Sequence, residues 1–191
     1  MKKISSDIYL ITGTDPTKKS AFLQRLQACL ERGISLIQLR AKQLNTVDYQ
    51  ELAQETIELC HQYAATILLN CEDITLVTQL NADGIQLSRA NLFTCKERPL
   101  PKNKIVAASC HSVEELLHAE KIEVDFVTLS PVLPTSSHPD ALLLGWDNFE
   151  KLVSKVKTPV FALGGMGVGD LDYAKQRGGH GIAAISAFWS D

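Results

Sequence analysis

The sequence FALGGMGVGD, residues 161–170, contains an apolar run followed by two adjacent glycines, a methionine and two further glycines. The run is typical of a buried β-strand, and a helical pattern follows at residues 169–178. Glycine permits a positive φ and a close approach of other atoms. Such a turn between a strand and a helix can present backbone amides to a phosphate. A tight turn without a ligand explains the same residues equally well.

The order of strand, turn and helix repeats along the chain. Eight short apolar runs are expected to be strands, at residues 8–12, 35–40, 66–70, 84–88, 104–109, 125–130, 159–164 and 181–186. Amphipathic patterns between them predict helices at residues 18–33, 46–64, 111–121, 146–156 and 169–178, while prolines weaken the pattern of residues 89–103. Eight alternating units predict an α/β fold, a compact (β/α)8 TIM barrel. A doubly wound open sheet is the alternative.

Local signals refine the helix ends. Thr46 is expected to be an N-cap, and the spacing of Ser112 and Glu115 matches a capping box. Residues 187–191 leave little room after the eighth strand, so the last helix is expected to be truncated or missing.

Composition excludes several classes of function. The 191 residues carry a net charge of −3 without a basic block, which argues against nucleic acid as a partner. No apolar run approaches the roughly 20 residues that span a bilayer, and the N-terminus does not resemble a signal peptide, so we expect a cytoplasmic protein. The five cysteines are scattered without a CxxC pair, which suits a reducing compartment. Cys29 and Cys60 fall within helical apolar patterns and are expected in the core.

Function in a barrel of this kind is located where the strands end. Gln38, Arg40 and Lys42 are spaced two apart at the end of the second strand, so their side chains should share one face. Two cations and an amide at the barrel mouth would suit a phosphate or diphosphate. The alternative is a solvated strand end.

Other strand ends also carry polar residues. Asn70 ends the third strand, Ser109 ends the fifth, and His111 follows two residues later. His111 is the best-placed histidine for acid–base chemistry, although it could equally be a helix-entry residue bonded to the backbone. The long segment SPVLPTSSHPDALLLGW, residues 130–146, resembles a lid or phosphate clamp. The loops after strands seven and eight, with Gly164, Gly165 and Ser186, are the usual phosphate site of this architecture.

Seven motifs occur in the order seen in thiamin-phosphate synthase and its relative TenI. They are QLRAK (38–42), LLN (68–70), ADGIQL (82–87), ASCHSVEEL (108–116), PVLPTSSHPD (131–140), ALGGM (162–166) and GIAAIS (181–186). The chain resembles this family over residues 7–188, and resembles most closely a synthase-like domain fused to MutT-type Nudix hydrolases. The resemblance implies that residues 1–191 form one synthase-like barrel domain, a transferase, with a homodimer as the expected assembly.

The resemblance also implies an activity and a set of site residues. The synthase joins an aminomethylpyrimidine diphosphate to a thiazole phosphate with release of diphosphate. By motif, Arg40 and Lys42 would hold the diphosphate, and Asn70 and Ser109 would lie beside the pyrimidine and the diphosphate. The phosphate and substrate contacts would come from Gln38, Thr135, Ser137, His138, Gly164, Gly165, Ile185 and Ser186. His138 replaces a lysine of the family.

This chain departs from the family at the metal site. The resemblance implies Mg²⁺ bound by two aspartates, but Cys71 and Asn91 occupy those positions, with Glu72 or Asp73 as substitutes if the alignment shifts by a residue. Thiols and amides are poor magnesium ligands. Three hypotheses follow: a synthase with an altered metal site, a non-catalytic phosphate-binding barrel serving a Nudix hydrolase, and a TenI-like thiazole tautomerase. The tautomerase histidine is replaced by Pro131, so His111 or His138 would be its base.

Overall fold

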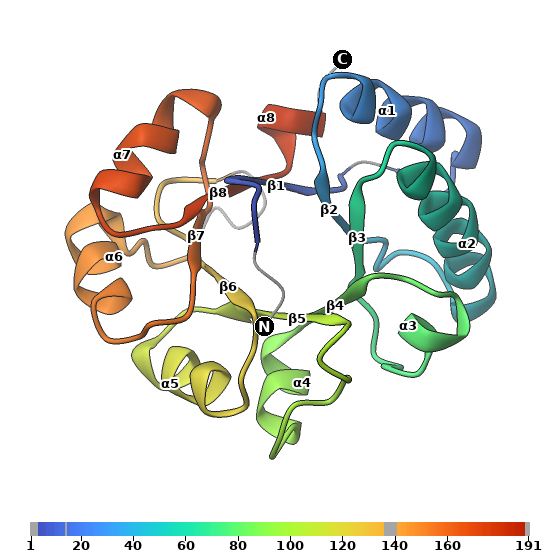
Figure 1. Cartoon of the computed structure of the whole chain (residues 1–191). Coiled ribbons are helices and arrows are strands. Elements are labelled where there is room, and N and C mark those ends of the chain that lie inside the picture. Colours follow the sequence, from blue (N-terminus) through green and yellow to red (C-terminus); the bar gives the residue numbers. More distant parts are fainter. Residues whose placement is uncertain (1–3, 14, 136–140, 190–191) are drawn as a thin grey trace.

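The computed structural model describes residues 4–13, 15–135 and 141–189, and its eight strands form a closed parallel barrel (Figure 1). The strands are β1 (Ile8–Ile11), β2 (Leu36–Leu39), β3 (Thr66–Leu69), β4 (Gly84–Leu87), β5 (Ile105–Cys110), β6 (Phe126–Leu129), β7 (Val160–Leu163) and β8 (Gly181–Ala184). Each strand pairs with the next, and β8 closes the barrel against β1, where Leu10 lies opposite Ala184. The predicted barrel is confirmed, and the open sheet is wrong.

Helices cover the outside of the strands (Figure 1). They are α1 (Lys19–Glu31), α2 (Thr46–Gln62), α3 (Leu76–Gln79), α4 (Arg89–Thr94), α5 (Val113–Lys121), α6 (Gly145–Val153), the 3₁₀ turn η1 (Val168–Asp170), α7 (Leu171–Gln176) and α8 (Ser186–Trp189). The short α3 was not predicted. The proline-containing segment 89–103 forms only the six-residue α4, as its weak pattern indicates.

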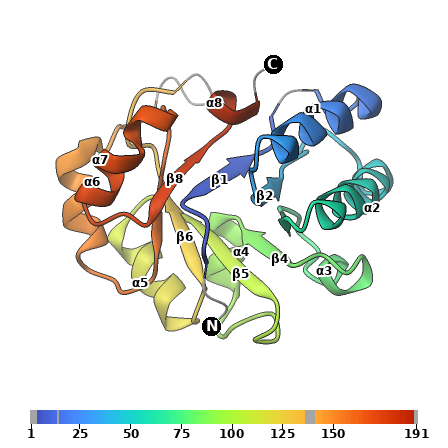
Figure 2. The same ribbon diagram turned by 45° about the horizontal axis from the view of Figure 1, so that its top comes forward.

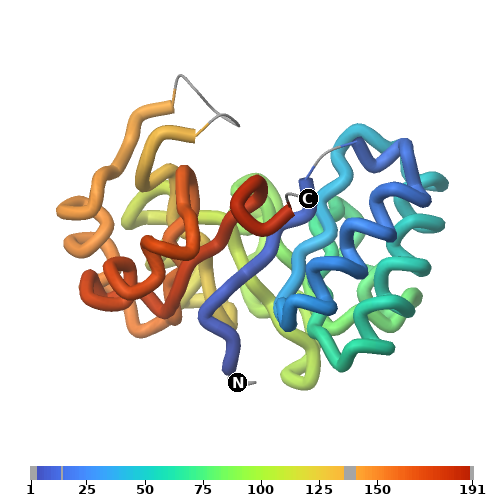
Figure 3. The backbone as a smooth tube through the Cα atoms, turned by 90° about the horizontal axis from the view of Figure 1, so that it is seen from above, coloured from blue at the N-terminus to red at the C-terminus, as the bar shows by residue number. Residues whose placement is uncertain are grey.

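The last helix is truncated, as predicted. Figure 2 shows α8 directly after β8, and Figure 3 shows it near β1 and α1, the first strand and helix of the chain. Trp189 of α8 packs on Phe22 of α1, with ring centroids 4.8 Å apart, and both residues are buried. Four residues therefore cover the gap that a full eighth helix would fill.

Local hydrogen bonds explain where two helices begin. The Asn45 side chain accepts a hydrogen bond from the Asp48 amide at 3.0 Å, so Asn45 is the N-cap of α2 and the prediction of Thr46 is wrong by one residue. At α5, Ser112 Oγ accepts from the Glu115 amide at 3.3 Å, as a capping box requires. The Glu115 carboxylate, however, accepts from the His111 amide at 2.6 Å and not from that of Ser112.

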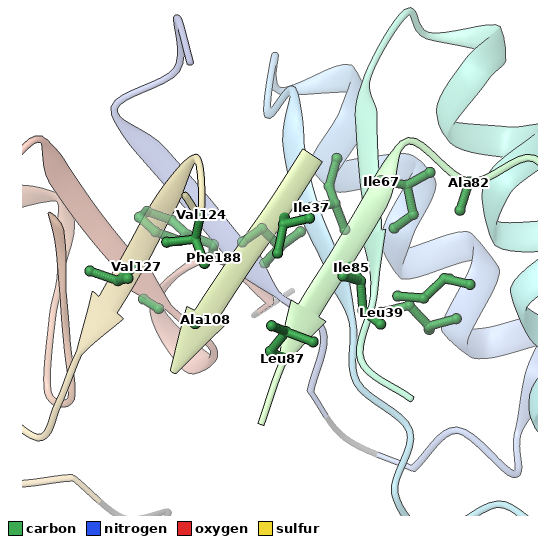
Figure 4. Packing of buried hydrophobic residues seen from close by; sticks show 14 of the residues in the cluster. Ile37, Leu39, Ile67, Ala82, Ile85, Leu87, Ala108, Val124, Val127 and Phe188 are labelled. Atoms are coloured by element: carbon green, nitrogen blue, oxygen red, sulfur yellow. The ribbon is translucent and has the colours of Figure 1, made fainter. Parts of the chain in front are cut away.

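The core has two layers, because successive residues of a strand point to opposite faces. Inside the barrel lie Tyr9, Leu68, Phe126 and Phe161 with five other buried residues. Between the strands and the helices lies a larger cluster, part of which Figure 4 shows, with Ile37, Leu39, Ile67, Ile85 and Leu87 on neighbouring strands. Both faces of the strands are therefore buried, which explains why their sequences are near-continuous hydrophobic runs with few polar residues.

The predicted core cysteines are also in place, since Cys29 and Cys60 are both buried. Within the described residues, no helix combines the length and the hydropathy needed to cross a membrane.

Candidate functional site

A cavity of about 770 Å³ opens at the carboxyl ends of the barrel strands. All eight strands contribute residues at or just after their last positions. Its described lining is Ile11, Gln38, Arg40, Lys42, Asn70, Ser88, Arg89, Ala90, Ser109, His111, Ser130, Pro131, Pro134, Thr135, Ala141, Leu163, Gly164, Gly165, Met166, Ala184, Ile185 and Ser186. The size suits a small-molecule ligand.

The three polar residues after β2 lie together in this cavity. Gln38 is buried, Arg40 is partly buried and Lys42 is exposed, and all three line the cavity. The three residues therefore share one cavity, although β2 ends at Leu39, so strand alternation does not itself place Arg40 and Lys42. Thr12 Oγ1 accepts a hydrogen bond from the Arg40 amide at 2.9 Å, which ties the end of β2 to the end of β1. Within the described residues, no ion pair joins a carboxylate to Arg40 or Lys42.

A chain of buried hydrogen bonds crosses the barrel beneath the cavity. Gln38 Nε2 donates to Tyr9 Oη at 3.2 Å, and Tyr9 Oη donates to Gln86 Oε1 at 3.0 Å. Gln86 Nε2 in turn donates to Ser109 Oγ at 3.0 Å. Burial raises the pKa of Tyr9 above its ordinary value, so the phenol keeps its proton and remains a donor. These hydrogen bonds fix the positions of two cavity-lining side chains, Gln38 and Ser109.

The glycine turn that follows β7 adopts the backbone conformation that its sequence indicates. Gly164 and Gly165 have φ values of +97° and +71°. Gly164 O accepts from the Leu133 amide at 3.0 Å, which holds the loop after β6 against the end of β7. A Cβ on Gly165 would lie 2.5 Å from the Pro134 carbonyl oxygen. This turn thus requires glycine for both conformation and contact.

A buried carboxylate organises the rim beside β4 and β5. Glu115 Oε1 lies 2.7 Å from Arg89 Nε, and Oε2 lies 2.9 Å from His111 Nδ1. The Glu115 side chain is only 3% exposed, whereas those of Arg89 and His111 are 69% and 45% exposed. The carboxylate therefore orients a guanidinium and an imidazole that both line the cavity. Both the backbone amide and Nδ1 of His111 contact Oε2 of Glu115, so the imidazole is held by a side-chain carboxylate, and its role in acid–base chemistry stays a prediction.

The positions at which the family resemblance implies metal-binding aspartates are occupied by Cys71 and Asn91. Asn91 Nδ2 donates to the Cys71 carbonyl at 3.3 Å, so the two substituted positions contact each other. Burial, together with nearby Asp73, raises the pKa of the Cys71 thiol to about 11, which keeps it protonated and a poor metal ligand. The Asp73 carboxylate accepts from the amide and hydroxyl of Thr75, at 2.9 and 2.7 Å.

These donors do not fit Mg²⁺, which binds carboxylates and water in octahedral geometry. Glu72 and Asp73 are exposed and are not part of the cavity lining, so the structure does not bring them into the site. Among the described residues, no group of three His, Cys, Asp or Glu side chains is placed to hold a metal ion.

The cavity brings together most of the predicted site residues. Those that line it are Gln38, Arg40, Lys42, Asn70, Ser109, His111, Thr135, Gly164, Gly165, Ile185 and Ser186. Ser137 and His138 lie outside the described residues. Sequence reasoning missed Ser88 and Arg89, although they directly follow β4 and the strand-end rule that selected the others would have found them.

Three comparisons with known proteins agree with one another. A family model described as thiamine monophosphate synthase matches residues 8–188. The chain is similar to thiamine-phosphate synthase of Streptococcus suis, with 34% identity over 98% of this chain and 83% of the relative, and to that of Clostridium acetobutylicum, with 28% identity over 100% and 90%. It is also similar to the solved thiamine phosphate pyrophosphorylase of Pyrococcus furiosus, with a TM-score of 0.80 and 29% identity over 97% of this chain and 88% of the other.

Proposed function

The chain belongs to the thiamine monophosphate synthase family of thiamin biosynthesis, and we propose that it joins a pyrimidine diphosphate to a thiazole phosphate in the cavity at the carboxyl ends of its strands. The observation that carries the proposal is the placement of Arg40 and Lys42 together in that cavity, on a chain with net charge −3. Cations in a concave site attract and orient anionic substrates.

In the proposed reaction, the bond between the pyrimidine methylene carbon and the diphosphate oxygen breaks, and its electron pair leaves with the diphosphate. The lone pair of the thiazole nitrogen then forms the new carbon–nitrogen bond to the methylene. Arg40 and Lys42 would stabilise the charge that develops on the leaving group. Asn70 and Ser109 would lie beside the pyrimidine and the diphosphate. Thr135, Ser137 and His138 would contact a phosphate.

The remaining phosphate contacts would come from the loops after β7 and β8. Gly164, Gly165, Ile185 and Ser186 would present their backbone to the thiazole phosphate, as the loops after the last two strands do in this architecture. No step is assigned to Mg²⁺, because the donors at the corresponding positions do not fit it.

The test is formation of thiamin phosphate by the purified chain from the two phosphorylated substrates, followed by chromatography. Arg40→Gln should lower kcat/KM by about tenfold or more, because it removes charge-assisted hydrogen bonds to the leaving group. Lys155→Gln is the matched control, since Lys155 is an exposed cation following α6, at the opposite end of the barrel. Absence of product with both substrates present would refute the proposal, and equal rates for the two variants would remove Arg40 from the site.

A second candidate is a thiazole phosphate tautomerase, favoured by the contact of His111 Nδ1 with Glu115. A histidine held by a carboxylate can act as a general base. Conversion of the thiazole phosphate alone, abolished by His111→Gln, would identify this activity. Binding of both substrates without either reaction would identify the phosphate-binding barrel.

We place the activity in the cytoplasm, because all five cysteines are free thiols, which a reducing compartment maintains. The homodimer expected from the family resemblance stays a prediction, and sedimentation of the purified chain would test it.

A further inference from the structure

The charge of the cavity differs from that of the whole chain. Three basic side chains line it, Arg40, Lys42 and Arg89, and the described part of the lining contains no carboxylate side chain. The complete sequence has 22 acidic and 19 basic residues, so the excess of cations is local. A site with this composition favours an anion carrying several charges.

Arg89 is held at this site by an ion pair with a buried carboxylate. Its Nε lies 2.7 Å from Oε1 of Glu115, a carboxylate that is 3% exposed and therefore well fixed. The second oxygen of Glu115 is engaged by His111, through both its amide and Nδ1. The guanidinium is thus anchored through Nε while its side chain remains 69% exposed at the cavity. An anchored guanidinium loses less side-chain freedom when it binds an anion.

Arg89 also lies close in the chain to the altered metal positions. It is two residues before Asn91, whose amide group is bonded to the Cys71 carbonyl. Where a divalent cation would need two carboxylates, this chain therefore supplies an amide, a thiol and a guanidinium. A cationic side chain, Arg89, therefore lies near the positions where ligands for a metal cation would be expected.

We propose that Arg89, anchored by Glu115, is the third cation of a diphosphate subsite formed with Arg40 and Lys42, and that this subsite binds diphosphate without a divalent metal. The inference rests on the proposed function for the identity of the anion. Arg89 would carry part of the negative charge that leaves with the diphosphate when the carbon–oxygen bond breaks.

The test uses the full chain and inorganic pyrophosphate, titrated calorimetrically in the presence of EDTA and again with excess Mg²⁺. We expect binding in EDTA that Mg²⁺ does not strengthen. Arg89→Gln should weaken it by about tenfold or more, as expected for a lost charge-assisted hydrogen bond, and Arg89→Lys should restore part of the loss. Lys155→Gln should bind like the unchanged chain, and circular dichroism should confirm that each variant is folded.

Binding that requires Mg²⁺, or equal affinities of Arg89→Gln and Lys155→Gln, would overturn the inference. Thiamin phosphate formation separates this failure from that of the proposed function. If pyrophosphate binds without metal and depends on Arg89, but no thiamin phosphate forms, the proposed subsite stands and the proposed synthase activity is refuted. If thiamin phosphate forms only with Mg²⁺ and at the same rate in Arg89→Gln, the proposed synthase activity stands and the metal-free subsite is refuted.

Discussion

Replacing Gly165 by alanine should destabilise the barrel and disturb the cavity at the same time. The residue has φ +71°, a left-handed conformation that costs an L-residue with a Cβ about 1–2 kcal/mol. The new Cβ would also lie 2.5 Å from the Pro134 carbonyl oxygen and 2.8 Å from Leu133 Cβ. Relieving such overpacking costs about 1–3 kcal/mol. We therefore expect the free energy of unfolding to fall by about 2–5 kcal/mol.

The assay is urea unfolding followed by circular dichroism. With a urea dependence of roughly 2 kcal/mol per molar, the midpoint should fall by about 1–2.5 M. Gly169→Ala is the matched control, because nothing lies within 4 Å of the Cβ that it would add and its φ lies outside the left-handed region. Unfolding of Gly165→Ala and Gly169→Ala at the same urea concentration would refute the reasoning. Gly165→Ala should also bind phosphorylated ligands more weakly, because the clash of its Cβ displaces a loop that lines the cavity.

Three further predictions concern buried and partly buried polar groups. Arg98→Met should lower the free energy of unfolding by about 3–5 kcal/mol in a urea titration, because it leaves the fully buried Asp125 carboxylate, 2.5 Å from Arg98 Nη2, without its cation. Tyr9→Phe should lower the same free energy by about 1–3 kcal/mol, because it leaves two buried glutamine side chains each short of a partner. At pH 8, Cys71 should react with iodoacetamide more than about 100-fold slower than a free thiol, because its pKa is raised to about 11. The reactive thiolate becomes abundant only as the pH approaches that value. Peptide mass spectrometry measures the rate of alkylation.

The first of these predictions has a control variant, and each has an outcome that would contradict it. Lys102→Met removes an ion pair to Glu123 in which both side chains are exposed, and it should leave the urea midpoint where it is. A midpoint for Arg98→Met equal to that of Lys102→Met would contradict the first prediction. Unchanged stability of Tyr9→Phe would show that water or another group replaces the lost hydroxyl. Alkylation of Cys71 at the rate of free cysteine would show that burial does not govern its pKa.

The fold could be predicted from sequence because its signals are local and repeated. Each apolar run is buried on both faces, so its hydrophobicity alone identifies a barrel strand. The expected helix end near Gly33 is present for the same kind of reason, since that residue has φ +86° and follows Arg32, the C-cap of α1. The short α3 escaped prediction because four residues are too few to display a helical period.

The site could be predicted only in part. Arg40, Lys42, Ser109 and Gly165 were found because a strand end in a parallel barrel must face the common mouth. The partners of these residues come from other strands and could not be found in this way. Gln86 reads as one more residue of an apolar run, and only the closed barrel places it between Tyr9 and Ser109.

The sequence by itself therefore determined the barrel, the end of the barrel that carries the site, and the family, because these depend on periodicity and on motifs short enough to recognise. Only the tertiary structure decided which charges act together. The side chains of Arg89, His111 and Glu115 meet because α4 and α5 pack side by side after neighbouring strands, and burial of Glu115 makes their contact specific. Electrostatic effects depend on distance and burial in space, and separation along the chain specifies neither.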